Sequence, residues 1–235
     1  MAHLESVIDK TENTGNLGKA QPQQIDAIKI MAKSKISVLT GGAGTGKTTT
    51  LAALCMSPEI QKNDIIVLAP TGKARVVLSS KLNKKNVKHK AYTVYQFLRK
   101  TSHCDWNTMR YYLSDEQNPE ASGATIIIDE CSMLTEEMMG GIAEAVKHAK
   151  RVILVGDPNQ LPPIGAGKPF FEIAEYISQS YPSNFAKLTV SNRQHGDSRL
   201  DSQLAKMFTF DQANEVPDDI FVQVLGTDTN IEIIS

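Results

Sequence analysis

Short runs of consecutive apolar residues recur along the chain, and stretches with helical spacing of apolar residues separate them. Runs that stay apolar on successive residues are typical of parallel strands that are covered on both faces. We expect such strands at residues 36–40, 65–69, 124–128, 151–155 and 188–190, with helices at 21–32, 51–54, 74–82, 91–98, 135–149 and 169–178. This alternation predicts an α/β fold in which a mainly parallel sheet carries helices on both faces.

The ends of the chain and one internal stretch lack this pattern. Residues 1–20 are polar and include Gly15 and Gly18, so we predict a flexible N-terminal arm followed by one domain over 21–235. Residues 101–122 are irregular and predict a small hairpin insertion, whose aromatic side chains either pack the hairpin or touch bases. A helix near 197–208 and short strands at 220–222 and 231–234 complete the expected elements.

A glycine-rich loop follows the first predicted strand. Its residues Gly41, Gly42, Ala43, Gly44, Thr45, Gly46, Lys47, Thr48 and Thr49 fit the pattern G-x-x-x-x-G-K-[ST]. Backbone N–H groups of such a loop wrap phosphate because glycine permits close approach and positive φ. The following helix directs its positive end towards the anion. We therefore expect a bound nucleotide phosphate, with Lys47 on its β- and γ-phosphates and the Thr48 hydroxyl on Mg²⁺; the alternative is a glycine-rich turn with a chance lysine.

Polar residues also follow three other predicted strands at their carboxyl ends, where ligands bind in open α/β sheets. After 124–128, Asp129 can hold Mg²⁺ and Glu130 can orient the attacking water as general base. After 151–155, Gln160 either bonds the γ-phosphate through its amide or belongs to a Pro-stiffened turn. After 188–190, Arg193 could neutralise γ-phosphate charge.

Further candidates lie before the phosphate loop and after residue 69. Gln24 either matches the hydrogen-bonding edge of adenine or is a solvent-exposed helix residue. Thr71, Lys73 and Arg75 lie at the carboxyl end of the 65–69 strand, on the same edge as the loop. Thr93 either caps a helix or contacts phosphate.

The net charge of −1 hides a basic segment, because residues 71–100 hold nine Lys or Arg and no Asp or Glu. The rest of the chain has 16 basic and 26 acidic residues, which is 25 minus nine against all 26. The segment is either a footprint for a phosphate backbone or a solvated basic face.

Bulk composition narrows the class of protein. The hydrophobic fraction of 41% and the charged fraction of 22% are ordinary for a folded domain. We find no apolar run of membrane-spanning length and no signal peptide, so we expect no membrane partner. Cys55, Cys104 and Cys131 are odd in number and lack C-x-x-C spacing, which argues against disulfides and zinc and favours a cytoplasmic location.

The ordered set of these segments resembles the N-terminal motor domain of a superfamily 1 DNA helicase. The resemblance is strongest to the RecD-like 5′-to-3′ branch, which includes helicase parts of conjugative relaxases. Single segments occur in many ATPases, whereas the order over about residues 20–210 is specific. The matching segments are 24–27 (Q motif), 41–48 (motif I), 68–75 (Ia), 91–98 (Ib), 128–133 (II), 156–162 (III) and 192–194 (IV).

The resemblance implies a RecA-like, P-loop NTPase fold and ATP-driven translocation on single-stranded DNA with duplex unwinding. Gln24 would then read adenine, and Gln160 and Arg193 would sense the γ-phosphate, while Mg-ATP would be handled by Lys47, Thr48, Asp129 and Glu130. Single-stranded DNA would lie along Pro70, Thr71, Lys73, Arg75 and Thr93. Such contacts go mostly to phosphate, so binding should be neutral to sequence.

The chain departs from the family in two ways. Tyr95 stands where relatives often have His in motif Ib, which affects the local DNA contact. The second RecA-like motor domain, with its arginine finger, has no counterpart here, so we expect a truncated chain or half-motor that is a monomer. Removing such an arginine typically costs about 10³–10⁵ in rate, so Mg-ATP binding with feeble hydrolysis and no unwinding is expected.

Two other function classes compete with a motor. A P-loop kinase would need a small-acceptor pocket and a lid. A non-motor nucleotide-dependent docking module for nucleic acid or protein would not need Lys47, Asp129 or Glu130.

Overall fold

The structure is a computed structural model, and it describes residues 17–105, 110–111 and 119–190. Arg193, the helix predicted near 197–208 and the strands predicted at 220–222 and 231–234 lie outside the described residues. The helices within the described part are α2 (Leu17–Lys33), α3 (Lys47–Cys55), α4 (Pro58–Gln61), α5 (Gly72–Lys84), α6 (Val94–Lys100), α7 (Glu136–Ala145) and α8 (Pro169–Ser180), with short 3-10 helices η1 (Cys131–Met133) and η2 (Pro182–Asn184).

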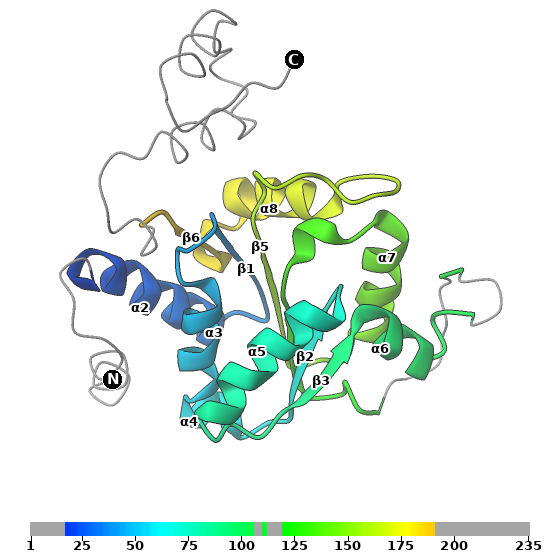
Figure 1. Ribbon diagram of the computed structural model, residues 1–235, viewed down its shortest axis with the longest axis horizontal. Helices are drawn as coiled ribbons and strands as arrows, with labels where there is room; N and C mark the ends of the chain where they lie inside the picture. Colours follow the sequence, from blue (N-terminus) through cyan, green and yellow to red (C-terminus); the bar gives the residue numbers. More distant parts are fainter. Residues whose placement is uncertain (1–16, 106–109, 112–118, 191–235) are drawn as a thin grey trace, which may run out of the picture. The chain divides into compact units, whose positions relative to one another are not determined.

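One sheet of six parallel strands forms the centre of the described part, in the order β3-β2-β4-β5-β1-β6 (Figure 1). The strands are β1 (Ile36–Gly41), β2 (Ile65–Ala69), β3 (Lys90–Thr93), β4 (Thr125–Ile128), β5 (Arg151–Gly156) and β6 (Phe185–Leu188). Because every pairing is parallel, the carboxyl ends of all six strands meet at one edge. The predicted fold class is therefore confirmed.

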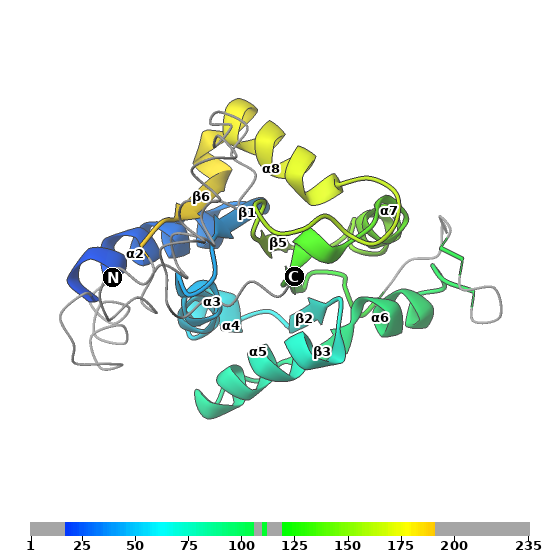
Figure 2. The ribbon, with the colours of Figure 1, turned by 45° about the horizontal axis from the view of Figure 1, so that its top comes forward.

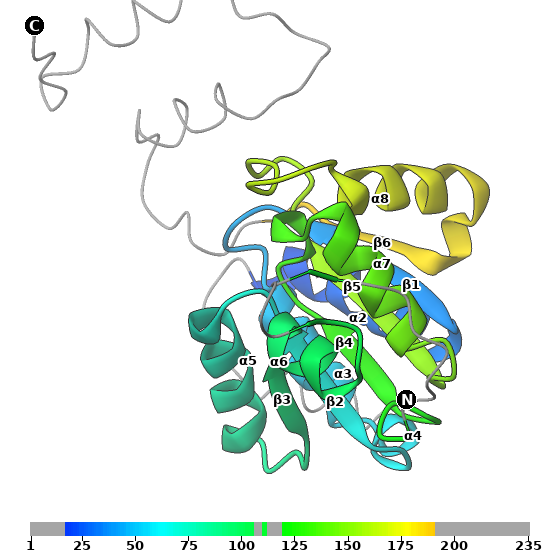
Figure 3. The same ribbon diagram turned by 90° about the vertical axis from the view of Figure 1, so that its right-hand side faces the viewer.

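Helices cover both faces of this sheet (Figures 2 and 3). Buried side chains of α2, α3 and α5 form one apolar cluster with the sheet, and those of α6, α7 and α8 form a second cluster on the opposite face. Ile127 belongs to the first cluster, whereas Ile126 and Ile128 belong to the second. Successive side chains of one strand thus meet different layers, which is why these strands are apolar at every position.

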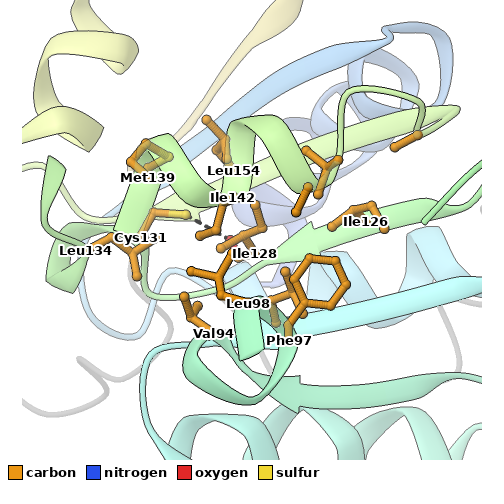
Figure 4. Packing of buried hydrophobic residues seen from close by; sticks show 14 of the residues in the cluster. Val94, Phe97, Leu98, Ile126, Ile128, Cys131, Leu134, Met139, Ile142 and Leu154 are labelled. Carbon is orange, nitrogen blue, oxygen red and sulfur yellow. Dashed lines mark hydrogen bonds between the residues drawn. The ribbon is translucent and has the colours of Figure 1, made fainter. Parts of the chain in front are cut away.

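The second cluster anchors the segment that carries the acidic pair. Figure 4 shows Phe97 of α6 and Ile142 of α7 close to Ile128 at the end of β4. Just beyond β4, the thiol of Cys131 donates a hydrogen bond to the carbonyl oxygen of Ile128 at 3.1 Å. Burial raises the pKa of this thiol well above its ordinary value. The chain on either side of Asp129 is therefore held by apolar packing.

Several predicted boundaries differ from those in the structure. Helix α2 begins at Leu17 rather than 21 and contains Pro22 within it. Residues 91–93 belong to strand β3, because they pair in parallel with β2, and the helix begins only at Val94. Helix α7 ends at Ala145 rather than near 149, because the chain then turns to enter β5, where Lys150 N–H donates to the Ala124 carbonyl.

The strand predicted at 188–190 was placed about three residues too late. Strand β6 is Phe185–Leu188 and has β1 as its one neighbour among the described strands. It alternates buried Ala186 and Leu188 with exposed Lys187. An edge strand of this kind has an alternating pattern, so a search for continuous apolar runs misses its start.

The remaining sequence-level expectations concern the cysteines and the irregular stretch. All three cysteines are free and buried. Cys104 and Tyr111 form an antiparallel bridge, which is compatible with a hairpin within 101–122. Among the helices of the described part, none has both the length and the apolar character needed to span a membrane.

Candidate nucleotide site and adjoining basic edge

The phosphate loop connects β1 to α3 at the carboxyl edge of the sheet. Gly44 and Gly46 have φ values of 78° and 89°, which lie in the left-handed region that favours glycine. The Thr45 hydroxyl donates to the Gly42 carbonyl at 2.9 Å and closes the loop. Lys47 Nζ donates to the carbonyl oxygens of Gly41 and Gly42 at 2.5 and 3.1 Å, so the ammonium group lies against the loop backbone.

Gln24 lies against this loop although it comes from α2. Its side chain is only 7% exposed, so the interpretation as a solvent-exposed helix residue was wrong. A Cβ placed on Gly46 would lie 2.5 Å from Gln24 Nε2, which shows how closely the amide approaches the loop. Helix α2 holds it there through buried Ala27, Ile28 and Met31.

We predict that Gly46→Ala weakens nucleotide binding by at least about tenfold. A left-handed L-residue costs about 1–2 kcal/mol, and the new methyl group would also collide with Gln24. Titration calorimetry with Mg²⁺ and ATP measures the change. Gly140→Ala is the matched control, because nothing lies within 4 Å of a Cβ at that helical position. Equal affinities for the two variants would contradict the prediction.

The acidic pair follows β4 on the same edge. Asp129 is 5% exposed, and its Oδ1 accepts the N–H of Glu130 at 3.0 Å. Burial, with the charge of Glu130 next in importance, raises the pKa of Asp129 to about 6, although Lys47 and Lys81 oppose the shift. Glu130 adopts a left-handed φ of 55°, an uncommon conformation that recurs at functional sites.

The segment after β5 brings two further polar residues to this edge. Gln160 is exposed, and its Oε1 accepts a hydrogen bond from the Ser132 hydroxyl at 3.2 Å, which joins the segment after β5 to the segment after β4. Its backbone N–H bonds to the Asp157 carbonyl, so the turn that we considered as the alternative is also present.

Asp157 was not among the predicted site residues. It is 6% exposed, and its Oδ2 lies 4.0 Å from the position of a Cβ on Gly42 in the phosphate loop. Its Oδ1 accepts the N–H of Asn159 at 3.0 Å. Its place directly after a buried strand, like that of Asp129, was the signal in the sequence that could have identified it.

The predicted nucleic-acid residues follow β2 and β3, which are neighbours in the sheet. Thr71 accepts the N–H of Ala74 at 3.2 Å and caps α5. Thr93 accepts a hydrogen bond from the N–H of Gln96 at 3.2 Å and caps α6. Of the two interpretations of Thr93, the capping role is therefore confirmed. Lys73 is exposed, and the Nε of half-buried Arg75 is shielded from solvent without an acceptor among the described residues.

Part of the basic segment is neutralised within the protein. Glu120 forms ion pairs with Lys90 at 3.1 Å and Lys100 at 2.7 Å, and it accepts a hydrogen bond from the Tyr92 hydroxyl at 2.9 Å. Burial alone would raise the pKa of Glu120, but the hydrogen bonds from Lys100, Lys90 and Tyr92 lower it overall. The other lysines of the segment, at 73, 81, 84, 85 and 88, are exposed.

The described residues contain no group of three or more His, Cys, Asp or Glu side chains that could hold a metal ion by themselves. Oxygen donors that could contribute to a magnesium site are the Thr48 hydroxyl and the Asp129 carboxylate. Mg²⁺ in nucleotide sites is usually held by one or two protein groups together with phosphates and water. The donor set therefore suits a metal that arrives with a nucleotide.

Known proteins are similar to this chain in sequence. Residues 19–214 match a family model described as an AAA domain. An uncharacterized protein of Methanocaldococcus jannaschii is 34% identical over 202 residues, covering 81% of this chain and 16% of that protein. The RecD subunit of the RecBCD enzyme of Haemophilus influenzae is 32% identical over 168 residues, covering 66% and 26%, respectively. The ATP-dependent RecD2 DNA helicase of Deinococcus radiodurans is 33% identical over 153 residues, covering 65% and 20%.

A solved structure shows the same fold. The Pif1 helicase from Candida albicans has a TM-score of 0.55 at 19% identity, and the match covers 91% of this chain and 47% of that one. The chain spans only 16–26% of the length of the three curated relatives named above.

Proposed function

We propose that this chain binds Mg-ATP and tracks along single-stranded DNA as part of a helicase. The premise is that the chain belongs to the AAA domain family and is a RecA-like motor domain of the superfamily 1 helicase type. One observation carries the proposal: Lys47, Asp129 and Gln160 lie at the same edge of an all-parallel sheet. An interpretation as a non-motor docking module is not favoured, because two of the relatives named above are a RecD subunit of the RecBCD enzyme and a RecD2 DNA helicase.

The residues of the site fit a nucleotide with Mg²⁺. The glycine loop can approach phosphate closely, and the carbonyls of Gly41 and Gly42 already hold a lysine ammonium group beside it. When bound, ATP would supply the phosphoanhydride bond and Mg²⁺ would neutralise phosphate charge. Thr48 and Asp129 would hold the metal, and Gln24 would face the adenine.

The remaining side chains have separate roles in this proposal. Lys47 binds the β- and γ-phosphates, and Glu130 accepts a proton from the attacking water. Gln160 contacts the γ-phosphate and transmits its presence to the segment after β4 through Ser132. Arg193 adds positive charge at the γ-phosphate in this scheme, and it lies outside the described residues.

Single-stranded DNA is the proposed nucleic-acid partner. Pro70, Thr71, Lys73, Arg75 and Thr93 follow two adjacent strands and would contact the phosphate backbone. The buried Nε of Arg75 supports this assignment, because a phosphate oxygen would supply the acceptor that it lacks among the described residues. Recognition through phosphates would be independent of base sequence. We propose that the chain acts in the cytoplasm and as a monomer.

The proposal is tested by measuring binding of two ligands to the 235-residue chain. We expect calorimetry to detect a non-hydrolysable ATP analogue only when Mg²⁺ is present. We expect fluorescence anisotropy to detect a labelled oligothymidine, with affinity falling as salt rises. Failure to bind nucleotide would overturn the proposal, as would transfer of phosphate from ATP to a small acceptor, which would identify a kinase.

A further inference from the structure

Helix α5 connects the proposed DNA edge to the nucleotide site. Its first turn carries Lys73 and Arg75, and its N-terminal cap is Thr71. Its later turns pack on α3, because Leu78 and Leu82 of α5 are buried in the same cluster as Leu51 and Leu54 of α3 (Figures 1 and 2). The first turn of this 13-residue helix therefore lies at the proposed DNA edge, and its later turns pack on the helix that follows the phosphate loop.

Lys81 is the residue of α5 that reaches the nucleotide site. Its Nζ donates to the Thr49 hydroxyl at 3.5 Å, and Thr49 lies in the first turn of α3, directly after Thr48. The Lys81 side chain therefore links the last turn of α5 to the first turn of α3.

We propose that Lys81 is a positioning residue that couples DNA binding at the first turn of α5 to nucleotide binding at the first turn of α3. The inference rests on the proposed function. A hydrogen bond of 3.5 Å is at the long limit, so a small displacement of α5 either strengthens or breaks it. A bound DNA strand that displaces α5 would therefore change the distance between the positive charge of Lys81 and Thr49. By linkage, a nucleotide that draws Lys81 closer would change DNA affinity by the same factor.

The test measures the affinity of the 235-residue chain for Mg²⁺ with a non-hydrolysable ATP analogue, with and without saturating oligothymidine. Three variants are compared with the unaltered chain: Lys81→Met, which keeps the apolar stem, Lys81→Arg, which keeps the charge, and Lys84→Met. Lys84 is exposed on the last turn of the same helix, so its variant removes the same charge from α5. Thermal unfolding verifies that each variant is folded.

We expect DNA to change nucleotide affinity at least about fivefold in the unaltered chain, a change within the usual range for coupled sites. Lys81→Met should reduce the change to less than about twofold, whereas Lys81→Arg and Lys84→Met should retain most of it. Unaltered coupling in Lys81→Met would overturn the inference, as would an equal loss in Lys84→Met or independent binding of the two ligands to the unaltered chain. If the unaltered chain failed to bind nucleotide, the proposed function itself would be overturned.

Discussion

Lys47→Ala should lower ATP hydrolysis by about 10²–10³-fold, because it removes the cation that stabilises charge developing on the transferred phosphoryl group. Nucleotide affinity should fall as well, since the helix end and the loop N–H groups would remain as the main anion ligands. Among the described residues, Lys47 Nζ donates hydrogen bonds to the carbonyls of Gly41 and Gly42, and loss of these two bonds should change thermal stability little. The measurements are hydrolysis in the presence of single-stranded DNA and calorimetric nucleotide binding.

Lys62→Ala is the control for this experiment, because Lys62 is exposed at the C-terminal end of α4. It removes one positive charge outside the phosphate loop and should leave both measurements unchanged. If Lys47→Ala retained the nucleotide affinity and hydrolysis of Lys62→Ala, the phosphate loop would not be the working site. A docking module that does not use its loop would then be the better interpretation.

Asp129→Asn should have opposite effects on stability and function. The pKa of Asp129 in the folded chain, about 6, exceeds the ordinary value of 3.8, so the folded state holds the proton more tightly than the unfolded state. The favourable contribution of the protonated Asp129 carboxyl to the free energy of unfolding is complete below about pH 4, and it is lost as pH rises through about 6. Asparagine avoids this loss and should stabilise the metal-free chain at pH 7.5 by roughly 2–3 kcal/mol, or by about 4–12 °C in Tm.

Thermal unfolding at several pH values tests the cause of this stabilisation. The difference in Tm between Asp129→Asn and the unaltered chain should be small near pH 4, grow up to about pH 6 and remain constant above it. A difference that does not depend on pH would show that burial of the charge is not the cause.

The functional effect of Asp129→Asn should be a large loss of Mg-dependent nucleotide binding, because a neutral amide is a poor substitute for a carboxylate ligand of Mg²⁺. In the unaltered chain, the same affinity should fall about tenfold for each pH unit below 6, because the carboxyl must lose its proton to bind metal. Calorimetry between pH 5 and 8 measures both effects. Tight Mg-nucleotide binding by the asparagine variant would remove Asp129 from the metal site.

The sequence by itself determined the strands of the interior and the edge at which function would be found. Continuous apolar runs such as 65–69 and 124–128 can be satisfied only by burial on both faces, and helical stretches between them require parallel crossovers. Parallel strands share one carboxyl edge, so the proximity of Lys47, Asp129 and Gln160 followed from their positions after strands. Locally determined features, such as the Thr93 cap, were also predictable because the residues involved are close in the chain.

Only the tertiary structure decided which side chains from distant segments touch. Gln24 meets Gly46 because the apolar stripe of α2 packs on the sheet and α3 with one orientation. Glu120 neutralises Lys90 and Lys100 although the basic segment contains no acid of its own, and Lys81 reaches Thr49 across two helices. Spacing along the chain reports which face of an element a residue occupies, whereas contacts between elements depend on how their surfaces pack together.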